Sequence, residues 1–322
     1  MRRFFLLLTP WLALGLSVYA VDLPFFSVGP GPAREVNPRI DIEGRRTFES
    51  RGRLMLTTVN LGRVNVFGAL EAWIDPSVDV VPESAVLSPG QTERQHREES
   101  NLDMDESKIA AVAVALRRIT GYPQEHGDGV LIQDVIEGAP ASGRLFPGDV
   151  ILAADGEPID ELDELRSAIR SAGTRRDLRL RVRSGDERRT VALRPIRRPE
   201  GNGPIIGVVL VENFPFEIRI DSGDVGGPSA GLMWALGVVD VLTPGDLTSG
   251  RTVAGSGVID LEGGVHPVGG IEHKILAAEE EGADVFLVPE GNVADARAVA
   301  KDIDLVPVGR IEEALAYLEG GS

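Results

Sequence analysis

The sequence predicts a multidomain α/β chain of the α+β kind: an N-terminal membrane helix, then a β-rich domain, then a C-terminal domain that mixes helices and strands. Two observations lead to this expectation. An apolar run opens the chain, and strand-like segments with glycine-rich turns precede segments typical of buried helices. The chain has 322 residues, 43% hydrophobic and 26% charged, which is enough for two or three folded domains.

The N-terminal segment is typical of export. Arg2 and Arg3 precede an apolar run from Phe4 to Val21, which is about long enough to span a bilayer as a helix. The paired arginines would stay cytoplasmic, so everything after residue 30 would lie outside a cell membrane that the chain crosses once. Val18-Tyr-Ala20 also fits a signal-peptide cleavage site, so a cleaved and secreted form is the alternative.

Composition excludes several classes of function. The formal net charge of −17 argues against a nucleic-acid partner, which normally requires a basic face. The sequence has no cysteine, and its four histidines show no metal-binding spacing, so we expect neither a metal nor another cofactor. It also has no GxxxxGK[ST] loop, so we expect no ATP binding.

The first folded part begins with segments that resemble short strands, from Arg53 to Ile74. The polar stretch from Ser88 to Asp105 lacks apolar periodicity and indicates a surface connection. Helical spacing of apolar residues then predicts a helix from Glu106 to Ile119. We expect residues 35–123 to pack with the C-terminal domain.

The next segment resembles a PDZ domain over residues 124–196. Its motifs are a glycine loop and short strand, Gly138-Ala-Pro-Ala141, Pro147-Gly-Asp-Val-Ile-Leu152, and a helix from Leu162 to Ala172. PDZ domains bind an extended peptide beside a strand. The resemblance therefore implies peptide contacts in one short segment, unless these residues are only a hairpin and a core strand: Gly127, Asp128, Gly129, Val130 and Leu131.

A candidate nucleophile lies in the segment Asp221 to Gly231. Ser229 sits on a glycine-rich turn just before an apolar stretch that predicts a buried helix. Open backbone N–H groups and the positive helix end would favour a developing oxyanion there, with Gly227 and Pro228 in the oxyanion loop and the amides of Gly227 and Ser229 as candidate donors. Taken alone, the motif fits a simple helix cap equally well.

A candidate base lies on the helix predicted from Ile271 to Gly282. At about 100° per residue, Lys274 shares the apolar stripe with Ile275 and Ala278, whereas His273 falls on the face expected to meet water. Desolvation lowers the pKa of a buried lysine and makes it competent to take a proton from a serine.

From Pro204 to Leu318 the sequence resembles the proteolytic domain of Lon proteases. The matching motifs are Gly227-Pro-Ser-Ala-Gly231 and Val265-His-Pro-Val-Gly-Gly270 before Lys274. The resemblance implies that Ser229 is the nucleophile and Lys274 the general base. Ser256 stands where Lon has a threonine and is a plausible third member of the site. Gly226 replaces an acidic residue of Lon.

The whole chain resembles the exported PDZ-Lon proteases of actinobacteria and other Gram-positive bacteria. It would then divide into a signal anchor, N-terminal strands and helix, a PDZ domain and a Lon-type proteolytic domain, at residues 1–26, 35–123, 124–196 and 204–320. The resemblance implies an ATP-independent serine endopeptidase that cleaves unfolded or flexible exported or membrane proteins, with the PDZ domain for peptide recognition or regulation. Lon domains form rings, so a homo-oligomer is possible.

Two other functions stay open. A Ser-His-Asp hydrolase would use His266 or His273 as its base, but the sequence has no GNSGG motif. The other is a membrane-tethered PDZ scaffold with an inactive Lon-like domain. Such a scaffold would not need Ser229 and Lys274, and the presence of both residues argues against it.

Overall fold

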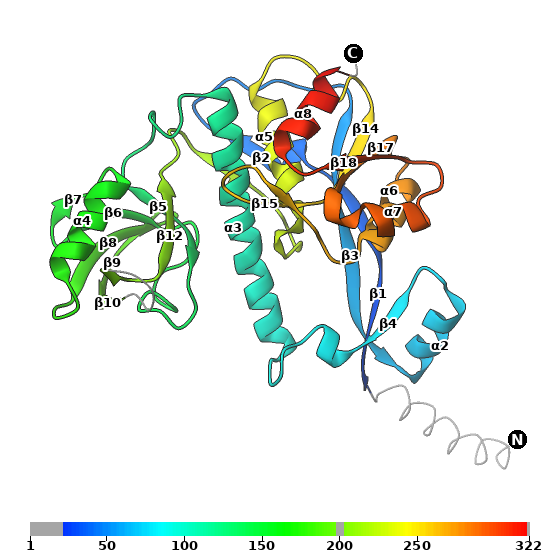
Figure 1. Cartoon of the computed structure of the whole chain (residues 1–322), viewed down its shortest axis with the longest axis horizontal. Coiled ribbons are helices and arrows are strands. Elements are labelled where there is room, and N and C mark those ends of the chain that lie inside the picture. The colour runs from blue at the N-terminus through cyan, green and yellow to red at the C-terminus, as the bar shows by residue number, and fades with distance from the viewer. Residues whose placement is uncertain (1–21, 198–202, 321–322) are drawn as a thin grey trace, which may run out of the picture.

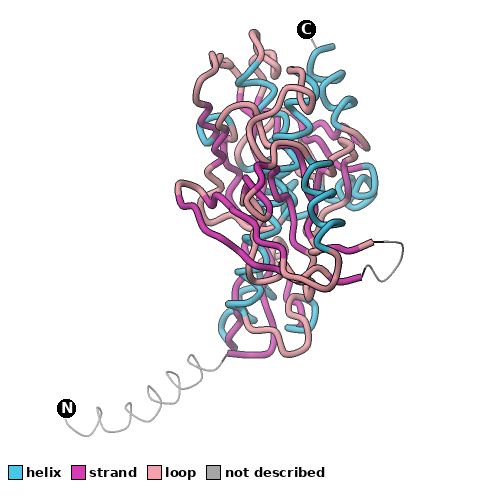
Figure 2. The backbone as a smooth tube through the Cα atoms, turned by 90° about the vertical axis from the view of Figure 1, so that its left-hand side faces the viewer, coloured by secondary structure: helices cyan, strands magenta, loops and turns pink. Residues whose placement is uncertain are grey.

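The computed structural model describes residues 22–197 and 203–320. The predicted anchor at residues 1–26 lies almost wholly outside them. Within the described residues, no helix is both long and apolar enough to cross a membrane. The start of the first strand and the last helix lie at opposite ends of the molecule (Figures 1 and 2).

A mixed sheet forms the centre of the larger domain. Its strands lie in the order β18 (Asp304–Val308), β17 (Val285–Pro289), β14 (Thr252–Gly255), β3 (Arg53–Asn65), β1 (Asp22–Glu35) and β4 (Asp79–Pro82). β14 runs parallel to both β3 and β17, whereas β1 is antiparallel to β3 and β4. This domain is therefore built from chain segments on both sides of the PDZ-like region.

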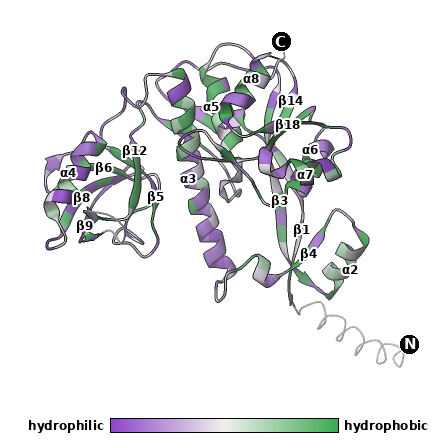
Figure 3. Cartoon of the chain, viewed as in Figure 1, coloured by the Kyte–Doolittle hydropathy of each residue, from purple (hydrophilic) through white to green (hydrophobic). Residues whose placement is uncertain are grey.

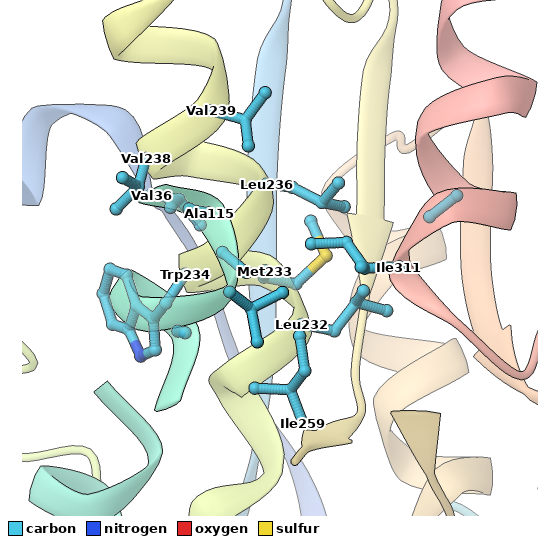
Figure 4. Packing of buried hydrophobic residues seen from close by; sticks show 14 of the residues in the cluster. Val36, Ala115, Leu232, Met233, Trp234, Leu236, Val238, Val239, Ile259 and Ile311 are labelled. Atoms are coloured by element: carbon cyan, nitrogen blue, oxygen red, sulfur yellow. The ribbon is translucent and has the colours of Figure 1, made fainter. Parts of the chain in front are cut away.

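Helices cover this sheet, and the core lies between them. α5 (Gly231–Leu242) packs against α3 (Glu93–Ile119), while α6 (Ile271–Glu280) packs against β1 and β3. α7 (Val293–Val299) and α8 (Ile311–Gly320) complete the helices of the C-terminal part. Residues 231–241 of α5 are all buried, Trp234 completely, so other parts of the domain surround this helix. Figure 4 shows the packed side chains, among them Ala115, Leu232, Met233, Leu236, Ile259 and Ile311.

The PDZ-like domain is a second, antiparallel sheet with its own core. Its strands lie in the order β12 (Val208–Glu212), β5 (Val130–Val135), β6 (Val150–Ala154), β8 (Leu178–Ser184) and β9 (Glu187–Leu193), with β7 (Glu157–Pro158) beside β6 and the helix α4 (Leu162–Ala172). Ile109 of α3 packs with Leu131, Val150 and Val211, which joins the two domains. Residues 204–212 thus lie with the PDZ-like sheet, although we expected the C-terminal domain to begin at residue 204.

Short strand pairs complete the fold. β2 (Ile40–Ile42) pairs with β13 (Ile218–Ile220), β10 (Ile196–Arg197) with β11 (Pro204–Ile205), and β15 (Val258–Ile259) with β16 (Val265–His266). Short 3₁₀ turns cover Asn37–Arg39, Glu83–Ala85, Pro228–Ala230 and Glu290–Asn292.

Two sequence-based expectations are wrong. Only the first part of the segment 53–74 is a strand, because residues Val66–Ile74 form the helix α2. The stretch 88–105 is not a simple connection, because α3 already begins at Glu93. Thr92 and Gln95 form a capping box there, which satisfies free N–H groups of the first turn without any apolar periodicity.

Candidate active site

Ser229 lies on the short turn that leads into α5. Gly227 has φ 80°, a conformation that favours glycine, and the 3₁₀ turn Pro228–Ala230 follows directly. Ser107 of α3 donates a hydrogen bond from Oγ to the Pro228 carbonyl at 2.9 Å. The turn is therefore held by a neighbouring helix, and it presents Ser229 at the N-terminal end of a buried helix.

Lys274 meets Ser229 from α6. Its side chain is 3% exposed, in agreement with the apolar stripe in the sequence. Nζ donates to Ser229 Oγ at 2.8 Å and to Ser256 Oγ at 3.0 Å. The structure thus brings together the three side chains that the sequence analysis singled out for catalysis.

Burial changes the acidity of this amine. Desolvation lowers the pKa of Lys274 from its ordinary value of 10.5 to about 8, because the ammonium form loses its hydration. A substantial fraction of Lys274 is then neutral near pH 8, with a lone pair that can accept a proton.

Ser256 ties the amine to the nucleophile turn. It lies between β14 and β15, is 1% exposed, and donates from Oγ to the Ser229 carbonyl at 2.9 Å. The Gly257 amide donates to the same carbonyl at 2.8 Å. Because Ser256 also accepts from Lys274, it fixes the direction of the amine relative to Ser229.

The site opens into a cavity of about 190 Å³. Arg34 of β1 and Asp224 of the loop before Ser229 both line it and form an ion pair at 2.5 Å. This pair lowers the pKa of Asp224. Sequence analysis missed these two residues and the wall of the cavity that β1 and β3 form, because nothing in the local sequence indicates that these strands reach the site. The residues that line the cavity are Pro32, Arg34, Thr57, Thr58, Val59, Asn60, Asp224, Val225, Gly226, Ser229, Ala230 and Lys274.

The oxyanion loop differs from the expectation. The Gly227 amide, expected as an oxyanion donor, donates to the carbonyl of Ser100 on α3 at 2.7 Å. Pro228 has no N–H group to offer. In this structure neither residue supplies a donor to the site, because α3 holds the turn by its backbone.

The two histidines of the alternative triad lie elsewhere. His266 Nε2 is 2.6 Å from Asp260 Oδ2 and its side chain is exposed. His273 is buried, contrary to the expectation of a wet face, and its Nε2 is 3.3 Å from Asp79 Oδ2. β1 and β3 pack against α6, and Asp79 at the start of β4 lies beside His273. Neither histidine lines the cavity that contains Ser229.

The predicted peptide-contact segment of the PDZ-like domain is also wrong. β5, which contains Val130 and Leu131, pairs with β12 on one side and β6 on the other, so it cannot accept a further strand. The preceding residues Gly127, Asp128 and Gly129 are held as well: the Gly127 amide donates to the Asn213 carbonyl, and Asn213 Nδ2 donates to the Asp128 carbonyl. The strand order in the described part of the chain places β12 at the edge instead.

Comparison with known proteins matches both parts of the chain. Residues 211–318 match the family described as the Lon protease (S16) C-terminal proteolytic domain. These residues form a Lon-type proteolytic domain. Residues 111–194 match the PDZ domain family, so the Lon-type domain is joined to a PDZ domain.

Several Lon proteases are similar to this Lon-type domain. The chain is 33% identical over 112 residues to one from Rickettsia bellii, a match that covers 33% of the chain and 14% of that protein. It is 40% identical over 104 residues to one from Trichlorobacter lovleyi, covering 30% of the chain and 12% of that protein. The likeness therefore spans about a seventh of the length of these relatives or less.

Among solved structures, the PDZ domain of an SdrC-like protein from Listeria monocytogenes aligns with 26% identity and a TM-score of 0.25. The alignment covers 26% of this chain and 90% of that one. At this TM-score it adds nothing to the family match.

Proposed function

We propose that this chain is an ATP-independent endopeptidase in which Ser229 is the nucleophile and Lys274 the general base. One observation carries the proposal: the Lys274 amine is buried and lies 2.8 Å from Ser229 Oγ. A lysine in that position has a lowered pKa and is in reach of the proton that it must accept.

The proposed chemistry is acyl transfer. Ser229 Oγ bonds to the carbonyl carbon of the peptide while its proton passes to neutral Lys274. The tetrahedral intermediate then expels the amine, which takes that proton from Lys274, and the acyl group stays on Ser229. Water attacks the acyl-enzyme, gives a proton to Lys274, and Ser229 recovers its proton as the acid leaves. Ser256 acts as a positioning residue that directs the amine.

The substrates we propose are unfolded or flexible segments of exported or membrane proteins. The sequence contains no phosphate-binding loop that could drive unfolding with ATP. The cavity at Ser229 is small, about 190 Å³, and suits an extended chain better than a folded domain. Location outside the cell and attachment through the N-terminal apolar run are part of this proposal.

The PDZ domain would bind a peptide along β12. A cavity of about 950 Å³ lies between β12 and α4. Ile169 and Ile206 contribute apolar side chains to it, while Arg166 and Arg170 of α4 add positive charge. An extended peptide would add to the edge strand by backbone hydrogen bonds, with an apolar side chain in the cavity and an acidic one near the arginines.

The test is casein hydrolysis by the full-length chain without ATP. We expect wild type and the Ser171→Ala control, an exposed serine on α4, to cleave equally well, and Ser229→Ala to lose cleavage. Cleavage retained by Ser229→Ala would disprove the assigned nucleophile. A stable phosphonyl adduct on Ser229, detected by mass spectrometry after treatment with a serine-reactive phosphonate, would support it directly.

A further inference from the structure

The outward face of the helix α2 is apolar. Val66, Leu70 and Ile74 recur every four residues and are 46%, 54% and 71% exposed. Residues at this spacing form one stripe on a helix, and a helix that faces water normally places polar residues there. Figure 3 shows α2 coloured largely as hydrophobic. Ala72 packs inward, so the helix is not simply detached from the domain.

The position of α2 is set by strand register. Asn65, the last residue of β3, pairs with Asp22, the first residue of β1. Asp22 directly follows the apolar run from Phe4 to Val21 in the sequence. Figure 1 shows the start of β1 and α2 at the same end of the molecule. If the apolar run enters a membrane, the membrane surface therefore lies close to the first turn of α2.

We propose that the apolar face of α2 inserts into the interfacial region of the lipid bilayer, as a second attachment beside the N-terminal run. This inference depends on the membrane attachment proposed above. A short helix with an exposed apolar face can lie in the boundary between headgroups and acyl chains. Phe25 and Val80, on the neighbouring strands β1 and β4, are 39% and 41% exposed and add apolar surface near the start of β1.

Charge and size favour a bilayer over a protein partner. α2 is about 14 Å long at 1.5 Å per residue, and one face of it is far smaller than the roughly 800 Å² per partner of a stable protein interface. The N-terminal apolar run would hold α2 close to the bilayer, so insertion of α2 costs the protein little additional translational and rotational entropy. Asp22, Asp75 and Asp79 flank the surface, which favours zwitterionic over anionic lipid.

This arrangement would fix the distance between the active site and the bilayer surface. Pro32 and Arg34 line the cavity of Ser229, and Pro32 lies ten residues beyond Asp22 along β1. At about 3.3 Å per strand residue, the cavity would stand about 30 Å from the bilayer surface. Segments of membrane proteins that reach this height would be the preferred substrates.

The experiment uses the absence of cysteine in the sequence. A fluorophore is attached to Leu70→Cys in the full-length chain, which is reconstituted into phosphatidylcholine vesicles that contain nitroxide-labelled lipid. The matched control is Asp186→Cys, an exposed site in the turn between β8 and β9. We expect at least a twofold loss of fluorescence at position 70, insensitive to salt, and none at position 186.

Each other outcome overturns the inference. If the protein floats with the vesicles but position 70 is not quenched, α2 does not insert, while attachment through the N-terminal run is supported. If the protein does not float with the vesicles, both the insertion of α2 and the membrane attachment are disproved. If position 70 is shielded from water without quenching by lipid, a protein surface covers α2 instead. Casein hydrolysis by the same labelled protein reports separately on the proposed catalytic function.

Discussion

The two domains of this chain carry their functional groups in opposite ways. In the Lon-type domain the candidate site consists of buried side chains, with Lys274 3% and Ser256 1% exposed. In the PDZ domain the candidate groove is built on the backbone edge of β12 and an exposed face of α4. Catalysis at the first should therefore depend steeply on single side chains, whereas binding at the second should be spread over many weak contacts.

The largest effect should come from Lys274→Met, which keeps the apolar stem and removes the amine. We expect kcat/KM to fall by about 10³-fold or more, because no other base lies within hydrogen-bond reach of Ser229 Oγ among the contacts described here. Peptidase assays and thermal unfolding would be compared with the exposed Lys301→Met control. Activity within tenfold of wild type would exclude Lys274 as the base.

Ser256→Ala should have an intermediate effect. Loss of the hydroxyl removes one partner of the Lys274 amine and one donor to the Ser229 carbonyl. We expect kcat to fall about 10 to 100-fold with little change in KM, since substrate does not need to contact Ser256. Ser256→Thr, which keeps the hydroxyl, should restore most of the rate. Equal losses in both variants would indicate a packing role.

The pH profile tests the buried amine without mutation. Lys274 must be neutral to accept a proton, and burial lowers its pKa to about 8. Activity should therefore fall about tenfold per pH unit below 8 and level off above it. A rate that stays constant from pH 6 to 9 would contradict a lysine base. A variant of an exposed PDZ residue should leave this midpoint unchanged.

Sequence alone could predict the side-chain chemistry but not the pairing of distant strands. A glycine-rich turn indicated Ser229, an apolar stripe indicated a buried Lys274, and the resemblance to Lon proteases paired the two. The same reasoning placed the peptide-contact segment on β5, because only the strand order shows that β12 covers that edge. α2 was predicted as strand from its composition. His273 was predicted to face water because periodicity cannot show that a second layer covers α6.

The smallest effect should come from the PDZ groove, and it sharpens the contrast with the catalytic site. Arg166 and Arg170 are exposed, so their attraction for a peptide is screened by salt. Reversing both charges to glutamate should weaken binding of a peptide with an apolar C-terminus and acidic residues about three- to tenfold at low salt, and less at high salt. Fluorescence polarisation would measure this, with Arg188→Glu on β9 as the matched control outside the groove.

Cleavage of a short peptide that does not reach the groove should be unchanged. If the reversal instead abolished that cleavage, the groove and the active site would be energetically coupled, and binding along β12 would then regulate Ser229.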